Sequence, residues 1–94
     1  MKTLSEIQYK PKPEFFHKFL DDVLNDGTNS YVVVKEDEIY QFWITGSIDA
    51  ISEAQPDALD WLDERRHMLQ EYSDGHGHTK AWTGLVYKDP NENG

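Results

Sequence analysis

The most regular hydrophobic pattern in the chain follows a short segment with two prolines. Pro11 and Pro13 exclude a helix over residues 9–13, because each proline disfavours the α conformation in the residue before it. Pro13 itself suits the first position of a helix. Beyond it, apolar residues recur at helical spacing: Phe15, Phe16, Phe19, Leu20, Val23 and Leu24. With Gly27 as a stop signal, the pattern predicts an amphipathic helix over residues 14–25.

Three later segments are rich in β-branched and aromatic residues and therefore favour strands. Residues 30–35 and 38–45 predict an antiparallel hairpin, and residues 79–87 predict a third strand with Gly84 as a possible bulge. Alternation along residues 38–45 leaves both faces of that strand apolar. A sheet with one solvated face needs only one apolar face. The second apolar face therefore indicates a dimer or partner contact there.

A second helix is predicted over about residues 50–72. Ser52 and Gln55 have the spacing of a capping box, and Pro56 offers a rival start at the first helical position. The apolar side of this helix is predicted to carry Ala54, Ala58, Trp61, Leu62, Met68, Leu69 and Tyr72.

Taken together, these elements predict one α+β domain over residues 1–94 with the order α-β-β-α-β. The expected architecture is a small three-stranded antiparallel sheet with two helices packed on one face. Residues 1–12 are expected to form an extended lead-in, and residues 89–94 a frayed polar tail.

Composition adds a strong charge bias, with 18 acidic and 9 basic residues and a net charge of −9. Nucleic acids and anionic membranes bind through Lys and Arg, so both are disfavoured as direct partners, and a basic protein surface is favoured. Cysteine is absent, which excludes disulfides and thiolate metal sites and favours a reducing, cytoplasmic setting. No cofactor is expected. No signal peptide or membrane-spanning run is visible in the sequence.

Acidic residues of the second predicted helix recur at intervals of three and four, which places them in one stripe. The stripe consists of Glu53, Asp57, Asp60, Glu64 and Glu71, with His67 between the last two. A solvated surface is the ordinary interpretation of such a row. The functional interpretation is a line of carboxylates that stands in for DNA phosphates in a basic groove. The predicted hairpin tip, Glu36, Asp37 and Glu38, could extend that surface.

Other chemistry has weaker signals. His76 and His78 form a His-x-His pair that some metal sites use, although a polar loop before a strand is the ordinary interpretation of these residues. Catalytic motifs such as a nucleophile elbow or a phosphate-binding glycine loop are absent, so we expect a binding protein and not an enzyme. Tyr40 or an exposed tryptophan could serve as an aromatic binding anchor.

The two ends of the chain resemble phage uracil-DNA glycosylase inhibitors. Residues 80–89 and 91–93 are similar to the last strand and tail of that family, and residues 4–7 to its start. In size, charge and layout the chain also resembles small acidic phage proteins that imitate DNA, including anti-restriction proteins. The resemblance implies an inhibitor that occupies the nucleic-acid-binding surface of a restriction or repair enzyme. The alternatives are an immunity- or antitoxin-like protein with one specific partner, and a small metal-binding protein that uses His76 and His78.

Overall fold

The computed structural model describes residues 2–46, 57–75 and 77–90. The chain begins with strand β1 and continues through a 3-10 turn directly into helix α1. A hairpin, a second α-helical segment, another 3-10 turn and a last strand follow. The bounds are β1 Thr3–Tyr9, 3-10 turn Pro13–Phe15, α1 Phe16–Leu24, β2 Tyr31–Lys35, β3 Glu38–Thr45, α-helix 57–63, 3-10 turn Arg66–Met68 and β4 Thr79–Leu85.

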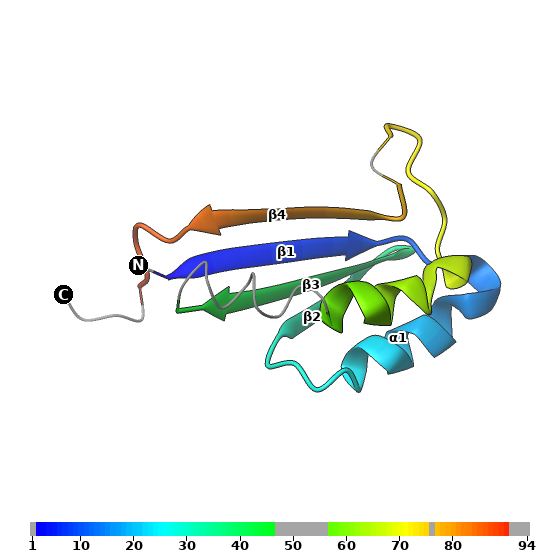
Figure 1. The fold of residues 1–94 in the computed structure, drawn as a ribbon, viewed down its shortest axis with the longest axis horizontal. Coiled ribbons are helices and arrows are strands. Elements are labelled where there is room, and N and C mark those ends of the chain that lie inside the picture. Colours follow the sequence, from blue (N-terminus) through cyan, green and yellow to red (C-terminus); the bar gives the residue numbers. More distant parts are fainter. Residues whose placement is uncertain (1, 47–56, 76, 91–94) are drawn as a thin grey trace.

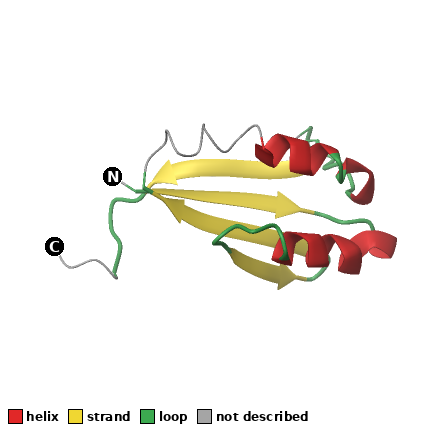
Figure 2. Ribbon diagram, turned by 60° about the horizontal axis from the view of Figure 1, so that its bottom comes forward, coloured by secondary structure: helices red, strands yellow, loops and turns green. Residues whose placement is uncertain are grey.

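The strands form a four-stranded antiparallel sheet in the order β2-β3-β1-β4, and both helices lie on one of its faces (Figures 1 and 2). The predicted α+β class, the hairpin, the first helix and the one-sided packing of the helices are confirmed. The predicted three-stranded sheet and the order α-β-β-α-β are wrong. The observed order is β-α-β-β-α-β, because residues 3–9 form a central strand and not an extended lead-in.

Strand β1 is central although four of its seven residues are polar. Its neighbours satisfy those residues across the sheet: the hydroxyls of Thr3 and Ser5 bond to those of Thr45 and Thr83. All four hydroxyl-bearing residues lie on the face that the helices cover, whereas Glu6 points to the other face. Buried polar groups are tolerated when they find such partners. The interior position of β1 therefore depends on hydroxyl pairs that a search for apolar alternation does not detect.

The core lies between α1 and the sheet. Phe19 and Val23 on the inner side of the helix are buried against Tyr9 and Ile39 from the two central strands. The ring of Phe19 meets that of Tyr9 edge-on, with centroids 4.9 Å apart, and Trp61 approaches the same ring at 5.7 Å. The apolar spacing that predicts the first helix therefore also identifies the residues that hold it to the sheet.

The second helix ends at residue 63, well before the predicted end at residue 72. Arg65 folds back and donates a hydrogen bond to the carbonyl oxygen of Trp61 at 2.9 Å, which suits the negative end of a helix. The chain then turns, and the extended segment that follows pairs with residues 10–12. The turn brings Met68 and Leu69 into the core together.

Strand β4 runs through Gly84 in continuous register with β1, so the predicted bulge is wrong. A Cβ atom at Gly84 would lie 3.4 Å from the ring of Trp82, which extends along the strand towards that position. That distance is an ordinary van der Waals contact, so a Cβ atom at this position would touch the indole without displacing it. Among the described residues, no helix has both the length and the apolar character needed to cross a bilayer.

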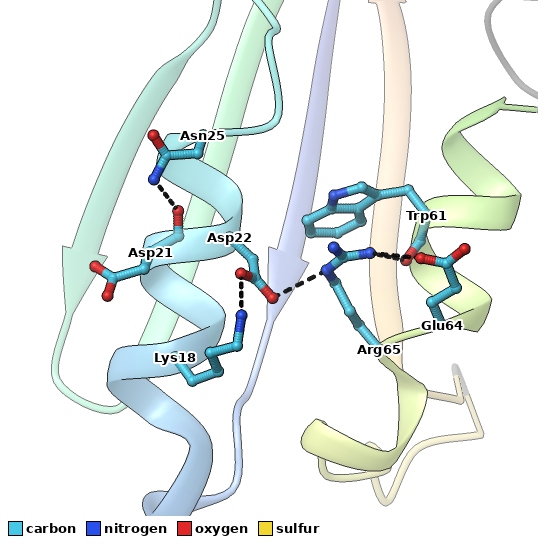
Figure 3. Close-up of polar contacts among 7 residues, drawn as sticks. All are labelled: Lys18, Asp21, Asp22, Asn25, Trp61, Glu64 and Arg65. Atoms are coloured by element: carbon cyan, nitrogen blue, oxygen red, sulfur yellow. Dashed lines mark hydrogen bonds and ion pairs between the residues drawn. The ribbon is translucent and has the colours of Figure 1, made fainter.

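A polar link joins the two helices on their outer side (Figure 3). Asp22 of α1 accepts hydrogen bonds from Lys18 at 2.6 Å and from Arg65 at 3.1 Å, and the guanidinium of Arg65 lies 4.4 Å from the ring centroid of Trp61. The hydrogen bond from Lys18, followed by that from Arg65, holds the pKa of Asp22 below its ordinary value.

Replacing Asp22 with Asn should lower the free energy of unfolding by about 1 kcal/mol at neutral pH. A carboxyl whose pKa is lowered by folding adds stability above its unfolded pKa and loses it as the pH falls through the folded value. The difference in the free energy of unfolding between wild type and Asp22→Asn should therefore be constant from pH 7 to about 5 and disappear below about pH 4. Urea unfolding across that range measures it. The exposed neighbour in Asp21→Asn is the control, and an equal effect there would contradict the assignment.

Candidate functional site

The predicted acidic stripe is not one continuous helical ridge. Asp57 and Asp60 are exposed on the 57–63 helix, and Glu64 lies just beyond its end, 3.3 Å from Arg65. Glu71 lies past the 3-10 turn on a different segment, and Glu53 lies outside the described residues. Because the helix ends early, the periodicity that relates these acids in the sequence does not relate them in space.

The three acidic residues of the hairpin tip have different environments. Glu36 and Asp37 are exposed in the tight turn, where Glu36 has a φ of 58°. Glu38 belongs to β3, lies opposite Lys35 of β2 and accepts a hydrogen bond from the Tyr40 hydroxyl at 2.8 Å. Two of the three predicted contacts are thus free to meet a partner, whereas Glu38 is a structural acceptor.

The histidine pair gives no metal centre within the part of the chain that the structure describes. His78 Nε2 lies 3.7 Å from a carboxylate oxygen of Glu71, and His76 lies outside the described residues. No group of three metal-ligating side chains occurs among the residues described.

The sheet face that the helices leave uncovered carries several of the exposed large apolar side chains, and we call it the open face. Register places Ile44 beside Leu4, and Phe42 between Tyr31 and Glu6, which has Trp82 on its other side. The exposed fractions are 75% for Tyr31, 51% for Trp82 and 50% for Ile44. The open face consists of Leu4, Glu6, Gln8, Tyr31, Val33, Tyr40, Phe42, Ile44, Lys80 and Trp82.

Glu6 lies at the centre of the open face and is nearly buried. One carboxylate oxygen accepts a hydrogen bond from Trp82 Nε1 at 2.7 Å, and the other accepts one from Gln8 Nε2 at 2.8 Å. These bonds fix the Trp82 indole across the neighbouring strand. They also satisfy the Glu6 carboxylate, whose charge would otherwise oppose the removal of water from this surface when a partner binds.

One end of the open face carries more polar groups. Lys80 lies 4.7 Å from the ring centroid of Tyr72 and forms an ion pair with Asp74 at 2.8 Å. Burial, followed by the negative charge of Glu38, raises the pKa of Tyr72 to about 12, so its phenol is neutral at physiological pH. The loop that carries Tyr72 and Asp74 therefore approaches the sheet at this end, and the apolar end around Ile44 and Trp82 stays exposed.

A pocket of about 580 Å³ lies on the opposite side, between the sheet and the 57–63 helix. Its walls are mainly apolar and include Ile7, Trp43, Trp61 and Leu62. Its polar lining comprises Tyr9, Asp26, Thr28, Gln41, Asp57 and Thr79. Because the lining comes from strands, a loop and a helix that are distant in sequence, no local motif predicts this pocket.

No protein-family profile matches the sequence, and no curated protein matches it. A solved structure is similar: that of a NIPSNAP family protein from Agrobacterium tumefaciens str. C58. The TM-score is 0.65 at 11% sequence identity, over 98% of this chain and 100% of that chain.

This structural match over nearly the whole chain corrects the sequence interpretation. The resemblance to uracil-DNA glycosylase inhibitors and anti-restriction proteins is wrong, and the DNA-mimic inhibitor and its alternatives are withdrawn with it. At 11% identity the likeness shows the fold alone. This chain has the α+β fold of that NIPSNAP family protein.

Proposed function

We propose that this protein acts by binding, without catalysis, and that its partner is a second copy of the same chain docked on the open face. The single observation that carries the proposal is the exposure of Tyr31, Ile44 and Trp82 on one face of the sheet. Exposed apolar patches of this kind mark interaction sites in soluble proteins. The basic protein partner suggested by the net charge stays a separate prediction.

The size of the open face suits a dimer. Four strands about 4.8 Å apart, five to eight residues long, present a surface of roughly 20 Å by 20 Å before the relief of the side chains is added. A stable interface needs about 1,000 Å² in total, or about 500 Å² per partner. Projecting rings such as Tyr31 and Trp82 add accessible area to the plane and bring the open face to that size.

The charge of the open face favours a copy of the same chain. Two chains with a net charge of −9 repel each other over most of their surfaces. On the open face and its margin, however, the carboxylates of Glu6, Glu38 and Asp74 lie among the cations of Lys35 and Lys80, which leaves a net charge of about −1. Self-association at this face therefore buries apolar area and brings together much less negative charge than the rest of the surface would.

The test is a pair of substitutions at matched exposed residues. Ile44→Lys places a charge in the proposed interface and should raise the dimer dissociation constant at least about a hundredfold. It also makes the chain less acidic, so general repulsion cannot explain a loss of the dimer. Leu24→Lys on α1, where the leucine is also exposed, is the control and should leave the dimer intact.

Light scattering after gel filtration measures the solution mass of both variants and so shows whether each is a monomer or a dimer. A wild-type chain that stays monomeric up to high micromolar concentration would overturn the proposal. So would an Ile44→Lys protein that remains as dimeric as Leu24→Lys.

A further inference from the structure

The pocket between the sheet and the 57–63 helix lies on the opposite side of the sheet from the open face, so it is independent of the proposed dimer. Its volume of about 580 Å³ falls within the range of roughly 300–1,000 Å³ that is typical of small-molecule sites. Trp43 and Trp61 both line it, alongside Ile7, Leu62 and Ala81. These walls suit a flat, apolar body.

The polar end of the pocket is built around the carboxylate of Asp26. One of its oxygens accepts from the backbone N–H of Thr28 at 2.9 Å and from the Thr28 hydroxyl at 2.6 Å. The other accepts from Gln41 Nε2 at 2.8 Å. These donors are neutral, so they orient the carboxylate without cancelling its charge.

The hydrogen-bond donors around Asp26 are already used within the protein. The Tyr9 hydroxyl donates to Gln41 Oε1 at 3.1 Å, and burial raises the pKa of Tyr9, which keeps the phenol protonated. The two hydrogens of Gln41 Nε2 are shared among Asp26, Thr28 and Ser30. What this end of the pocket can offer a ligand is acceptor capacity on a charged carboxylate.

No lysine or arginine of the chain meets that charge. All nine lysines and arginines fall within the described residues, and none of them lines the pocket. Arg65 contacts the Trp61 ring, but it is paired with Asp22 and is not part of the pocket lining. A second carboxylate, Asp57, lines the pocket from the helix.

We infer that this pocket binds a small organic cation, with an aromatic or alicyclic body against the two tryptophans and a protonated amine directed to Asp26. The Asp26 carboxylate supplies a charge-assisted acceptor for the amine, and the two indoles contact the apolar body of the ligand. A carboxylate or phosphate ligand of the same size would face two negative charges and no available donor at Asp26, so the site selects against anions.

A matched series of three naphthalene probes tests the charge preference: 1-naphthylethylamine, 1-naphthaleneethanol and 1-naphthaleneacetate. Binding is followed by amide chemical shifts in ¹⁵N NMR titrations of the full chain, which report both affinity and location. The amine should bind about tenfold more tightly than the alcohol, and the acetate more weakly than either. The shifts should centre on Trp43, Trp61 and Ala81.

Three variants locate the effect. Asp26→Asn should weaken the amine about tenfold and leave the alcohol unchanged, whereas Asp21→Asn removes the same charge outside the pocket and should change neither. Ala81→Phe fills the pocket from an exposed strand position and should weaken all the probes, so it remains informative if Asp26→Asn disturbs the local turn. Equal binding of amine and acetate would overturn the inference, as would binding that Ala81→Phe leaves unchanged.

Discussion

Replacing Phe19 with Ala should lower the free energy of unfolding by about 3–5 kcal/mol, a large fraction of the total of a small domain. Phe19 is completely buried and packs edge-on against both Tyr9 and Trp61. Its removal therefore takes away contacts between α1, the central strand and the second helix at once. The melting temperature should fall by roughly 4–8 °C for each kcal/mol lost.

Calorimetry or urea unfolding measures this effect. All variants are compared at one protein concentration, because self-association adds to apparent stability. Tyr87→Ala is the control, since it removes a ring of similar size that is 83% exposed, and it should change stability by less than about 0.5 kcal/mol. A loss below about 1 kcal/mol for Phe19→Ala would contradict the assignment of Phe19 to the centre of the core.

Substitution of Gln41 should produce the second large effect, of about 2–4 kcal/mol for Gln41→Leu. The buried amide accepts a hydrogen bond from Tyr9 and donates to the Asp26 carboxylate, so leucine leaves a buried hydroxyl and a carboxylate short of partners. Gln41→Glu keeps the shape but should cost more at neutral pH, because it places a second carboxylate beside Asp26.

The pH dependence separates these two causes. Burial and the neighbouring Asp26 should raise the folded pKa of the new carboxyl in Gln41→Glu above its unfolded value. A raised pKa gives stability below the unfolded value and loses it as the pH rises through the folded one. The loss in the free energy of unfolding caused by Gln41→Glu should therefore become smaller as the pH falls from 7 towards about 4. The loss caused by Gln41→Leu should not become smaller in this way. Parallel pH profiles for the two variants would contradict the charge argument.

The sequence predicts those elements whose burial is periodic. Phe19 and Val23 lie on the inner side of α1 at the predicted spacing. The β-branched run of residues 31–35 forms the strand β2, but β2 is an edge strand and is mostly exposed, whereas so apolar a run is typical of a strand buried on both faces. Alternation along β3 also indicates an apolar second face, and Tyr40, Phe42 and Ile44 do lie on the open face. In α1 and β3 the local pattern and the tertiary environment agree.

Strand β1 is missed because its stability comes from partners that are distant in the sequence. Ser5 and Glu6 are polar, and they become acceptable in a central strand only when Thr83 and Trp82 supply hydrogen bonds. The length of the second helix is missed for a related reason. Its end depends on Arg65 folding back to Trp61 and on Leu69 pairing with Pro11.

The candidate sites follow the same division. The acidic stripe assumes one uninterrupted helix, so the end of that helix at residue 63 separates Glu71 from Asp57 and Asp60. The alternation along β3 predicts part of the open face. The part that contains Leu4 and Glu6 could not be predicted, because the pattern of residues 3–9 does not predict a strand. The pocket has no sequence signal, because its lining residues come together only in the folded chain.

The most direct test of the proposed dimer is an isotope-filtered NMR experiment on a mixture of ¹³C-labelled and unlabelled chains. It detects contacts that cross from one copy to the other. Our account predicts intermolecular cross-peaks from the methyl groups of Leu4, Val33 and Ile44 to aromatic protons of the partner copy. Cross-peaks confined to the exposed leucine of α1, Leu24, or no intermolecular cross-peaks in a sample at millimolar concentration, would contradict it.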